Sequence, residues 1–334
     1  MTKRIFISGV AGFLGSHLAD HMLALGHEVV GNDNMIGGYP DNVPDGVEFE
    51  QLDCNSPNLT KLMSDVDIVY HCAATAYEGL SVFSPYLISQ NNYMATVRMA
   101  SAAAENEVDR FVFTSSMARY GTNQVPFKEE MVPKPQDPYA VSKFASELLV
   151  SNMAESFDFE YVIGVPHNII GPRQKYDDPY RNVASIFINR MLQGKQPIIY
   201  GDGSQMRCFS FVNDTVGSLA KLGLMSGINK EIFNIGPDEE FITINTLAET
   251  IAEIIDFELS PIYMKARPQE VYLANCSADK ARKILNYKTS YTLKEGLQEM
   301  VDWIKQKGAK PFEYHLDLEI VHEKTPSTWK DKLM

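Results

Sequence analysis

Short apolar runs alternate with longer stretches of helical periodicity through the first half of the chain. The apolar runs predict strands over residues 4–8, 28–32, 66–73, 110–115 and 161–165. Between the first two, apolar residues at positions 14, 18, 22 and 25 form one face of a helix that Gly26 ends. Strands that alternate with helices are typical of a parallel sheet covered on both faces. The pattern therefore predicts an α/β fold with a doubly wound parallel sheet over residues 1–165.

The character of the sequence changes near Pro166, where Gly, Pro and Asn become denser and the predicted elements become shorter. Helical patterns return over residues 244–255, 278–285 and 293–305. We expect residues 166–310 to form a smaller α/β domain that closes over the sheet, with some segments returning to the first domain. Residues 311–334, which are polar and contain Pro326, are expected to form an appended tail.

A glycine-rich turn follows the first predicted strand, with Gly9, Gly12 and Gly15 at intervals of three residues. Such glycines permit a tight turn and let backbone amides approach a pyrophosphate, which the following helix N-terminus also favours. Asp33 ends the next strand, 18 residues beyond Gly15, near the distance expected of an acid that binds the adenosine ribose. This context predicts a Rossmann-type site for NAD, because an acid there repels the 2′-phosphate of NADP. The alternative is a plain glycine turn beside a solvated Asp33.

Composition and charge narrow the class of protein. The 334 residues, 45% of them hydrophobic, are enough for a substantial core, and the net charge of −13 argues against a nucleic-acid partner. The four cysteines have neither metal nor redox spacing, so we expect reduced thiols, no metal site and a cytoplasmic location. The first residues lead directly into an apolar strand-like run, and no run of about 18 apolar residues occurs, so we expect no secretory leader and no membrane partner.

The segment that begins at Asp137 carries candidate chemistry. Asp137 and Pro138 have the residue types of a helix N-cap and first helical position, and Tyr139 and Lys143 then share a face. A free phenol has a pKa of about 10, and a nearby ammonium together with the positive nicotinamide of NAD favours the phenolate. A Tyr and a Lys at this spacing also occur by chance. The Tyr139–Lys143 pair indicates a catalytic site only together with the dinucleotide motif and with Ser116, which lies at the end of a predicted strand.

Several motifs occur together between about residues 3 and 305: the glycine turn, Asp33, the segment His71-Cys72-Ala73-Ala74, Asn92, Ser116, Tyr139-x-x-x-Lys143 and Gly171-Pro172-Arg173. As a set they resemble the extended short-chain dehydrogenase/reductase family, particularly NAD-dependent nucleotide-sugar epimerases of the UDP-glucose and UDP-glucuronate 4-epimerase kind. The resemblance implies that Tyr139 is the acid/base and that Lys143 binds the nicotinamide ribose and tunes Tyr139. It implies that Ser116 binds the sugar hydroxyl that is oxidised.

The resemblance also implies two sets of binding residues. For NAD they are Gly9, Gly12, Phe13, Leu14, Gly15, Asp33, Asn34, Asp53, Cys54, Ala73, Ala74, Thr75, Asn92, Tyr139, Lys143 and Pro166. For a nucleotide-sugar substrate they are Ser116, Asn168, Asn182, Val183, Tyr200, Arg207, Arg267 and Glu270. Each of these arginines has a surface ion pair as its alternative role. A homodimer through the helices near residues 93–105 and 139–155 is implied as well.

The residues after Ser116 bear on the reaction type. The resembling dehydratases carry Asp-Glu at the positions of Met117 and Ala118, and the decarboxylases carry a Glu at that of Ala118. Without these acids we expect epimerisation at C4 through a 4-keto intermediate. A dehydratase, a decarboxylase or a reductase of the same superfamily is the alternative, followed by a non-catalytic NAD-sensing protein. Arg119 forms either a salt bridge at the sheet edge or a contact with a charged substrate group such as a uronate carboxylate.

Overall fold

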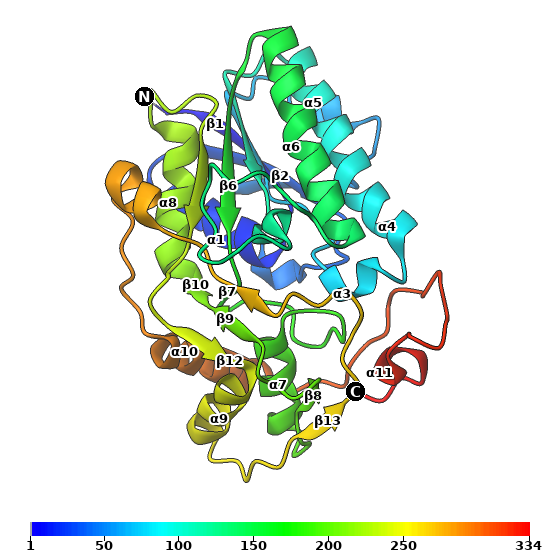
Figure 1. Cartoon of the computed structure of the whole chain (residues 1–334). Helices are drawn as coiled ribbons and strands as arrows, with labels where there is room; N and C mark the ends of the chain where they lie inside the picture. The colour runs from blue at the N-terminus through cyan, green and yellow to red at the C-terminus, as the bar shows by residue number, and fades with distance from the viewer. Residues whose placement is uncertain (1) are drawn as a thin grey trace.

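Seven parallel strands form the central sheet of the protein, in the order β11-β6-β5-β4-β1-β2-β3 (Figure 1). The structure is a computed structural model that describes residues 2–334. The strands are β1 (Arg4–Ser8), β2 (Glu28–Asp33), β3 (Val47–Gln51), β4 (Ile68–His71), β5 (Arg110–Thr114), β6 (Glu160–Pro166) and β11 (Ile232–Ile235). The strand order reverses between β1 and β4, and open α/β sheets bind ligands beyond the carboxyl ends of the strands at such a point. The sheet confirms the predicted Rossmann-type fold.

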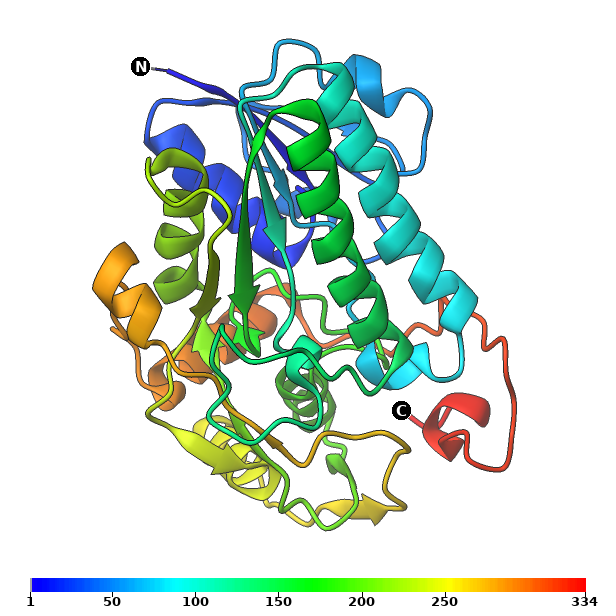
Figure 2. The ribbon, with the colours of Figure 1, turned by 45° about the horizontal axis from the view of Figure 1, so that its top comes forward.

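Helices cover both faces of the sheet (Figure 2). α1 (Phe13–Ala24) and α8 (Val212–Leu224) pack side by side on one face, and α5 (Ala95–Glu105) and α6 (Pro138–Phe157) pack on the other. Shorter helical segments connect them: η1 (Pro40–Asn42), α2 (Leu59–Leu62), α3 (Glu78–Ser81), α4 (Pro85–Ser89), η2 (Gln90–Met94) and η3 (Met117–Tyr120). α8 and β11 come from the second half of the chain, so the chain returns to the sheet after leaving it at β6.

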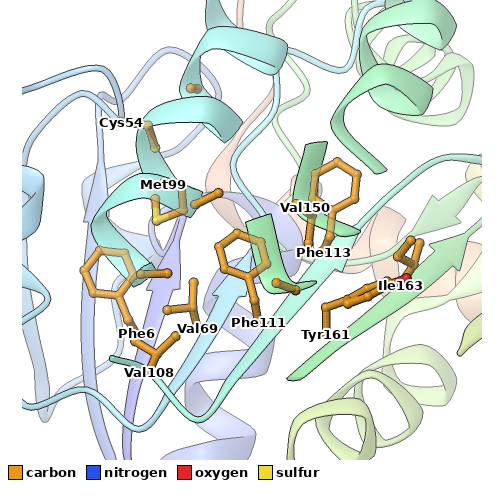
Figure 3. Packing of buried hydrophobic residues seen from close by; sticks show 14 of the residues in the cluster. Phe6, Cys54, Val69, Met99, Val108, Phe111, Phe113, Val150, Tyr161 and Ile163 are labelled. Atoms are coloured by element: carbon orange, nitrogen blue, oxygen red, sulfur yellow. The ribbon is translucent and has the colours of Figure 1, made fainter. Parts of the chain in front are cut away.

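Apolar side chains from the strands and helices interlock on each side of the sheet. Figure 3 shows Phe111 and Phe113 of β5 beside Met99 of α5 and Val150 of α6, all fully buried. Val112, between the two phenylalanines, points into the core on the opposite face, against α1 and α8. β5 is therefore held from both sides, and its carboxyl end places Ser116 at a defined position.

The second domain has its own core, formed by α7 (Val183–Leu192), α9 (Ile244–Ile255) and α10 (Leu293–Lys307). Three small sheets accompany these helices. The first contains β12 (Phe241–Thr243), β9 (Met206–Cys208) and β14 (Leu273–Ala274). The second contains β13 (Ile262–Met264) and β8 (Ile198–Tyr200), and the third contains β10 (Ser210–Phe211) and β7 (Ile169–Ile170). The predicted helix over residues 244–255 has the observed bounds, and α10 ends two residues later than predicted. Over residues 278–285 the chain is helical from residue 279, and its last part is the π-helical η4 (Ala281–Leu285).

The chain beyond residue 310 folds back against the molecule and is not the appended tail that the sequence suggested. It includes α11 (Ser327–Lys330), at the right of Figure 1, and Trp329 of this helix packs against Gly79 of α3. The side chain of Trp329 is only 3% exposed, so the end of this segment contributes to the core. Along residues 2–334, no helix is both long enough and apolar enough to cross a membrane.

Candidate active site

A single cavity at the carboxyl ends of the strands is lined by residues of both domains. Every residue that the sequence predicted for the cofactor or the substrate lines this cavity except Asn92. Asn92 is 2% exposed and makes two hydrogen bonds with the backbone of Thr75. Its Oδ1 accepts from the Thr75 amide at 2.8 Å, and its Nδ2 donates to the Thr75 carbonyl at 3.2 Å. Asn92 therefore positions the loop after β4 with its side chain, and a direct contact between Asn92 and NAD stays a prediction.

The glycine turn leaves no room for side chains. Gly9 has a φ of +72°, and a Cβ there would lie 2.9 Å from the Ala73 Cα. A Cβ on Gly15 would lie 2.2 Å from the carbonyl oxygen of Gly9. Gly12, at the N-cap of α1, provides no side-chain cap, so the first amides of the helix stay free to bind an anion. This cradle fits the pyrophosphate of a dinucleotide.

Asp33 lies beside the glycine turn at the end of β2. Its carboxylate accepts hydrogen bonds from the amides of Ala11, at 3.1 Å, and Met35, at 2.7 Å. Burial raises the pKa of Asp33, and the backbone donors partly offset that rise. Nearby, Asn34 Nδ2 donates to Asp53 Oδ2 at 2.7 Å. An acid held in this orientation fits the ribose hydroxyls of NAD, so the residues present match that cofactor.

Tyr139 lies in the first turn of α6, facing Ser116. Asp137 caps this helix by accepting a hydrogen bond from the Ala140 amide at 2.8 Å, and Pro138 follows at the first helical position, as predicted. The Tyr139 side chain is 5% exposed, and burial raises the pKa of its phenol above the usual value, while a hydrogen bond with Ser116 lowers it. The Ser116–Tyr139 pair can therefore hold a proton and pass it to a substrate oxygen in the cavity.

Lys143, one turn further along α6, donates from Nζ to the carbonyl of Thr114 at 2.8 Å. Burial lowers the pKa of this ammonium to about 8. The sequence predicted that a cation would favour the phenolate of Tyr139, but the net shift of the phenol pKa in the structure is upward. The reason is that burial, together with the negative charges of Glu78 and Asp137, outweighs the positive charge of Arg181.

Arg119 is buried behind the site and does not line the cavity. Its Nη2 lies 2.8 Å from Glu147 Oε2, and both side chains are 4% exposed. The hydroxyl of Ser115 donates to the other oxygen of the same carboxylate. The structure thus agrees with the salt bridge and contradicts a contact between Arg119 and the substrate.

The second domain contributes positively charged groups to the opposite wall of the cavity. Arg207 donates to backbone carbonyls, including that of Tyr272 at 3.1 Å, and among residues 2–334 no carboxylate forms an ion pair with it. Arg267 pairs with Glu270 at 3.0 Å and lies 4.7 Å above the ring of Tyr200. An ion pair was the alternative role for both arginines, and only Arg267 forms one. Both guanidinium groups remain available to an anionic ligand in the cavity.

The family model of the NAD dependent epimerase/dehydratase family matches residues 5–236 of the chain. The chain belongs to this family. It is similar to a putative UDP-glucose 4-epimerase of Methanocaldococcus jannaschii, with 34% identity over 91% of this chain and 99% of the relative. It is 32% identical to the UDP-glucose 4-epimerase of Mycolicibacterium smegmatis, over 91% and 99% of the two chains.

Among solved structures, the chain is similar to the UDP-glucuronic acid 4-epimerase of Bacillus cereus in complex with UDP-glucuronic acid and NAD. The TM-score is 0.85 with 30% identity, covering 91% of this chain and 100% of the other. As a member of the NAD dependent epimerase/dehydratase family, the protein is an NAD-dependent enzyme. The glycine cradle and Asp33 are the part of this enzyme that fits the cofactor.

Two charged residues of the cavity were not singled out from the sequence. Glu78 begins α3 and lines the cavity, and within residues 2–334 its carboxylate has no hydrogen-bond or ion-pair partner. The Glu78 side chain is exposed to the cavity, and desolvation by the surrounding walls, followed by the negative charge of Asp137, raises the pKa of its carboxyl to about 7. Its position shortly after the carboxyl end of β4 was the available signal, because ligands bind at that edge.

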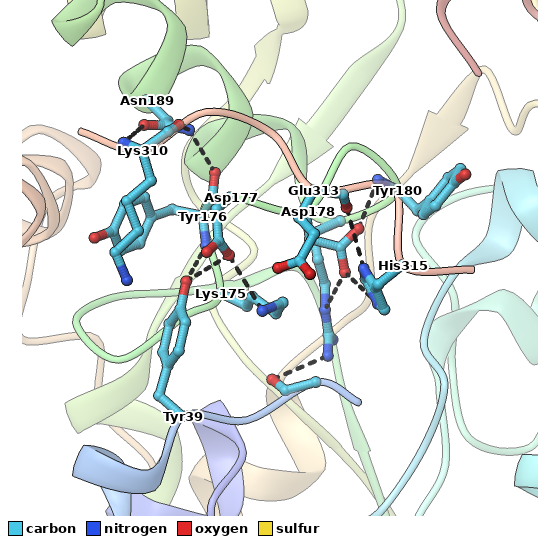
Figure 4. Close-up of polar contacts among 12 residues, drawn as sticks. Tyr39, Lys175, Tyr176, Asp177, Asp178, Tyr180, Asn189, Lys310, Glu313 and His315 are labelled. Atoms are coloured by element: carbon cyan, nitrogen blue, oxygen red, sulfur yellow. Dashed lines mark hydrogen bonds and ion pairs between the residues drawn. The ribbon is translucent and has the colours of Figure 1, made fainter. Parts of the chain in front are cut away.

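Arg181 is the second such residue. Its Nη2 donates to the Gly37 carbonyl at 3.2 Å, and its Nε lies 3.6 Å from a carboxylate oxygen of Asp178. Figure 4 shows the network around Asp178, in which Tyr39, Asp177 and His315 join the loop after β2 to the second domain and to the final segment of the chain. Arg181 therefore places a positive charge where the two domains meet. The sequence offered no signal for it, because only Asp178 is local, whereas Gly37, which ties the guanidinium to the loop after β2, lies 144 positions away.

Proposed function

We propose that the enzyme inverts C4 of a nucleotide sugar, with a UDP-hexose as substrate. The observation that carries the proposal is that Ser116, Tyr139, Lys143 and Arg207 line one cavity, in which Ser116 hydrogen-bonds to Tyr139. The cavity therefore contains a proton donor and acceptor, the Ser116–Tyr139 pair, and a positively charged group, the guanidinium of Arg207. The names of the related 4-epimerases support the same reaction class.

In the proposed reaction, Tyr139 removes the proton of the 4-hydroxyl while Ser116 hydrogen-bonds to the same oxygen. Bound NAD would be held by the glycine turn and Asp33, and it would supply the hydride acceptor and donor for C4. Arg207 and Arg267 hold the diphosphate, so that the sugar can turn over while the nucleotide stays bound.

The neighbours of Ser116 argue against elimination and decarboxylation. Met117 and Ala118 are buried, apolar residues with no acid to protonate or deprotonate the sugar. Glu78 is an acid elsewhere in the cavity, and its unpartnered carboxylate favours a neutral hexose over a uronate, because like charges repel. Arg119 is engaged with Glu147 and supplies no contact to a uronate carboxylate.

The test is to purify the protein and incubate it with UDP-glucose, UDP-galactose or UDP-glucuronate without added reductant. The expected result is interconversion of UDP-glucose and UDP-galactose, with NAD retained and little conversion of UDP-glucuronate. A stable keto product, or a requirement for reduced cofactor, would identify a dehydratase or reductase. Conversion of UDP-glucuronate alone would indicate a uronate epimerase. Bound NAD without any turnover would favour a sensing protein.

We also propose that two copies associate through α4, α5 and α6. Exposed apolar side chains lie on α4, on α6 and on η2, which leads into α5: Tyr86, Met94, Val141, Leu148 and Phe157, between 49% and 72% exposed. Large apolar side chains gathered on one surface are typical of protein interfaces. Leu148→Asp should shift the protein to a monomer in sedimentation velocity, whereas Leu224→Asp, on α8, should not. A monomeric parent protein would overturn the proposal.

A further inference from the structure

The final segment, residues 311–334, inserts an aromatic side chain into the cluster that contains the catalytic tyrosine. Trp329 is 3% exposed and packs in one apolar cluster with Tyr77, Phe83, Tyr139 and Tyr180. Its indole Nε1 donates to the Pro179 carbonyl at 3.2 Å, so the polar atom of the ring is satisfied as well. The segment is thus part of the structure that surrounds the active site.

Two residues of this segment contact the side chains that we assign to the substrate. The hydroxyl of Thr328, which is fully buried, forms a hydrogen bond with the hydroxyl of Tyr200. The guanidinium of Arg267 lies 4.7 Å from the centre of the Tyr200 ring and 6.0 Å from the centre of the Trp329 ring. Arg267 therefore contacts two aromatic faces, one from the second domain and one from the final segment.

The segment that carries Glu78 packs against the same two side chains, Arg267 and Trp329. A Cβ on Gly79 would lie 3.0 Å from the Trp329 ring and 3.1 Å from Arg267 Nη1. The backbone of α3, the guanidinium and the indole are therefore in direct contact. Met334, at the far end of the segment, lines the cavity itself.

The segment is fixed along its length by polar contacts with the rest of the molecule. Glu319 accepts hydrogen bonds from the amides of Tyr86 and Leu87, at 3.0 and 2.7 Å, in the first turn of α4. Its neighbour Ile320 donates from its amide to the Phe83 carbonyl at 2.9 Å. Tyr180 donates from its hydroxyl to the Leu316 carbonyl at 3.2 Å. These contacts hold Thr328 and Trp329 against Tyr200 and Arg267.

We propose that residues 311–334 are a positioning element of the substrate site, and that Thr328 and Trp329 orient Tyr200 and Arg267 toward a bound nucleoside diphosphate. The inference rests on the proposed function in one respect, the assignment of the nucleotide to these two residues. An arginine that is already oriented loses less conformational freedom when it binds, so the segment increases affinity for the nucleotide. Thr328 and Trp329 act through Tyr200 and Arg267, so binding of the nucleotide should change more than the rate of the chemical step.

The experiment measures UDP binding by titration calorimetry, together with kcat and KM for the sugar. Thr328→Val removes the hydroxyl that meets Tyr200, and Trp329→Phe reduces the ring that meets Arg267. We expect each variant to raise the Kd of UDP and the KM by about tenfold, a loss of about 1.4 kcal/mol, with kcat and bound NAD within twofold of the parent. An unchanged Kd in both variants would overturn the inference.

Matched controls are present in the chain. Thr325→Val removes another buried hydroxyl from the same segment, one that hydrogen-bonds to the backbone of Ile320 and His322 and has no hydrogen bond to Tyr200. Trp303→Phe makes the same change of ring in α10, against Tyr176. Both should leave the Kd of UDP within twofold of the parent, and an equal weakening in the controls would point to general destabilisation and overturn the positioning role.

A second measurement does not depend on turnover. The chain has two tryptophans, so in the Trp303→Phe protein Trp329 is the only source of indole fluorescence. UDP should change this emission in a saturable way, and saturation without any change would contradict the proposed contact. If the Thr328 and Trp329 variants weaken UDP binding but the parent epimerises no sugar, the proposed function fails and the inference stands. If the parent epimerises UDP-glucose but the variants bind UDP normally, the inference fails and the proposed function stands.

Discussion

The guanidinium of Arg119 and the carboxylate of Glu147 form an ion pair at 2.8 Å that joins the segment after β5 to the middle of α6. Burial raises the pKa of Glu147, and the positive charge of Arg119 together with the hydrogen bond from Ser115 opposes that rise. Because α6 carries Tyr139 and the segment after β5 carries Ser116, this pair links the two segments that hold the side chains we propose as catalytic. Arg119 therefore acts on the site through Glu147.

Arg119→Ala should destabilise the protein without changing its substrate preference. Removal of the guanidinium leaves a buried carboxylate without its partner, which costs about 3–5 kcal/mol. Urea denaturation measures the loss, and the relative rates with UDP-glucose and UDP-glucuronate measure preference. Replacement of both partners, as Arg119→Met with Glu147→Leu, should restore most of the stability. A changed preference with normal stability would show that Arg119 reaches the substrate.

Tyr139→Phe should remove most of the activity while the fold is kept. Loss of a general acid/base decreases kcat by about 10²–10⁴-fold, and the phenyl ring still fills the cluster with Trp329. The matched control is Tyr161→Phe, a buried tyrosine of β6 outside the cavity, which should retain normal kcat. Thermal unfolding would check both variants. Full activity in Tyr139→Phe would contradict the proposed mechanism.

Glu78→Gln should change the pH dependence of kcat/KM. Shielding from water raises the pKa of Glu78 to about 7, so its charge appears as the pH rises through that value. The charge raises the pKa of the Tyr139 phenol and opposes removal of its proton. We expect kcat/KM to decrease as the pH rises through about 7 in the parent, and this step to be absent in Glu78→Gln. The exposed Glu105→Gln serves as control and should keep the step.

The same carboxyl links stability to pH. Its pKa is higher in the folded protein than the ordinary value of 4.5, so the folded state binds this proton more tightly than the unfolded chain does. The free energy of unfolding should therefore decrease as the pH rises from about 4.5 to about 7. In Glu78→Gln this contribution should vanish, and denaturation at several pH values would detect it. An identical pH profile for parent and variant would place Glu78 in ordinary solvent.

Asp33→Asn should weaken the preference for NAD over NADP by about tenfold or more, equivalent to about 1.4 kcal/mol. The change keeps the shape of the side chain and removes the charge that repels a 2′-phosphate. Equilibrium binding of both cofactors to cofactor-free protein gives the ratio of affinities. Asp20→Asn, on α1 outside the cavity, removes an equal charge and should keep the parent ratio. An unchanged ratio in Asp33→Asn would show that other groups select the cofactor.

The strand β3 and the position of β11 in the sheet could not be predicted from the local sequence pattern. β3 has the sequence Val-Glu-Phe-Glu-Gln, and its residues are mostly exposed at the edge of the sheet, so it lacks the apolar run of a central strand. Its pairing with β2 stabilises it, and that partner lies elsewhere in the sequence. β11 is apolar, but its place beside β6 depends on the chain crossing back from the second domain.

The sequence alone determined the features whose causes are local. Glycines spaced three residues apart, the helix start at Asp137 and Pro138, and the amphipathic pattern over residues 244–255 each involve interactions within a few residues. The tertiary structure alone decided the partners of charged and buried groups. Arg119 meets Glu147 across 28 positions, and Thr328 meets Tyr200 across 128. Such pairs depend on how the sheet and the two domains pack, because the energy of a buried charge or hydroxyl depends on neighbours that no local pattern encodes.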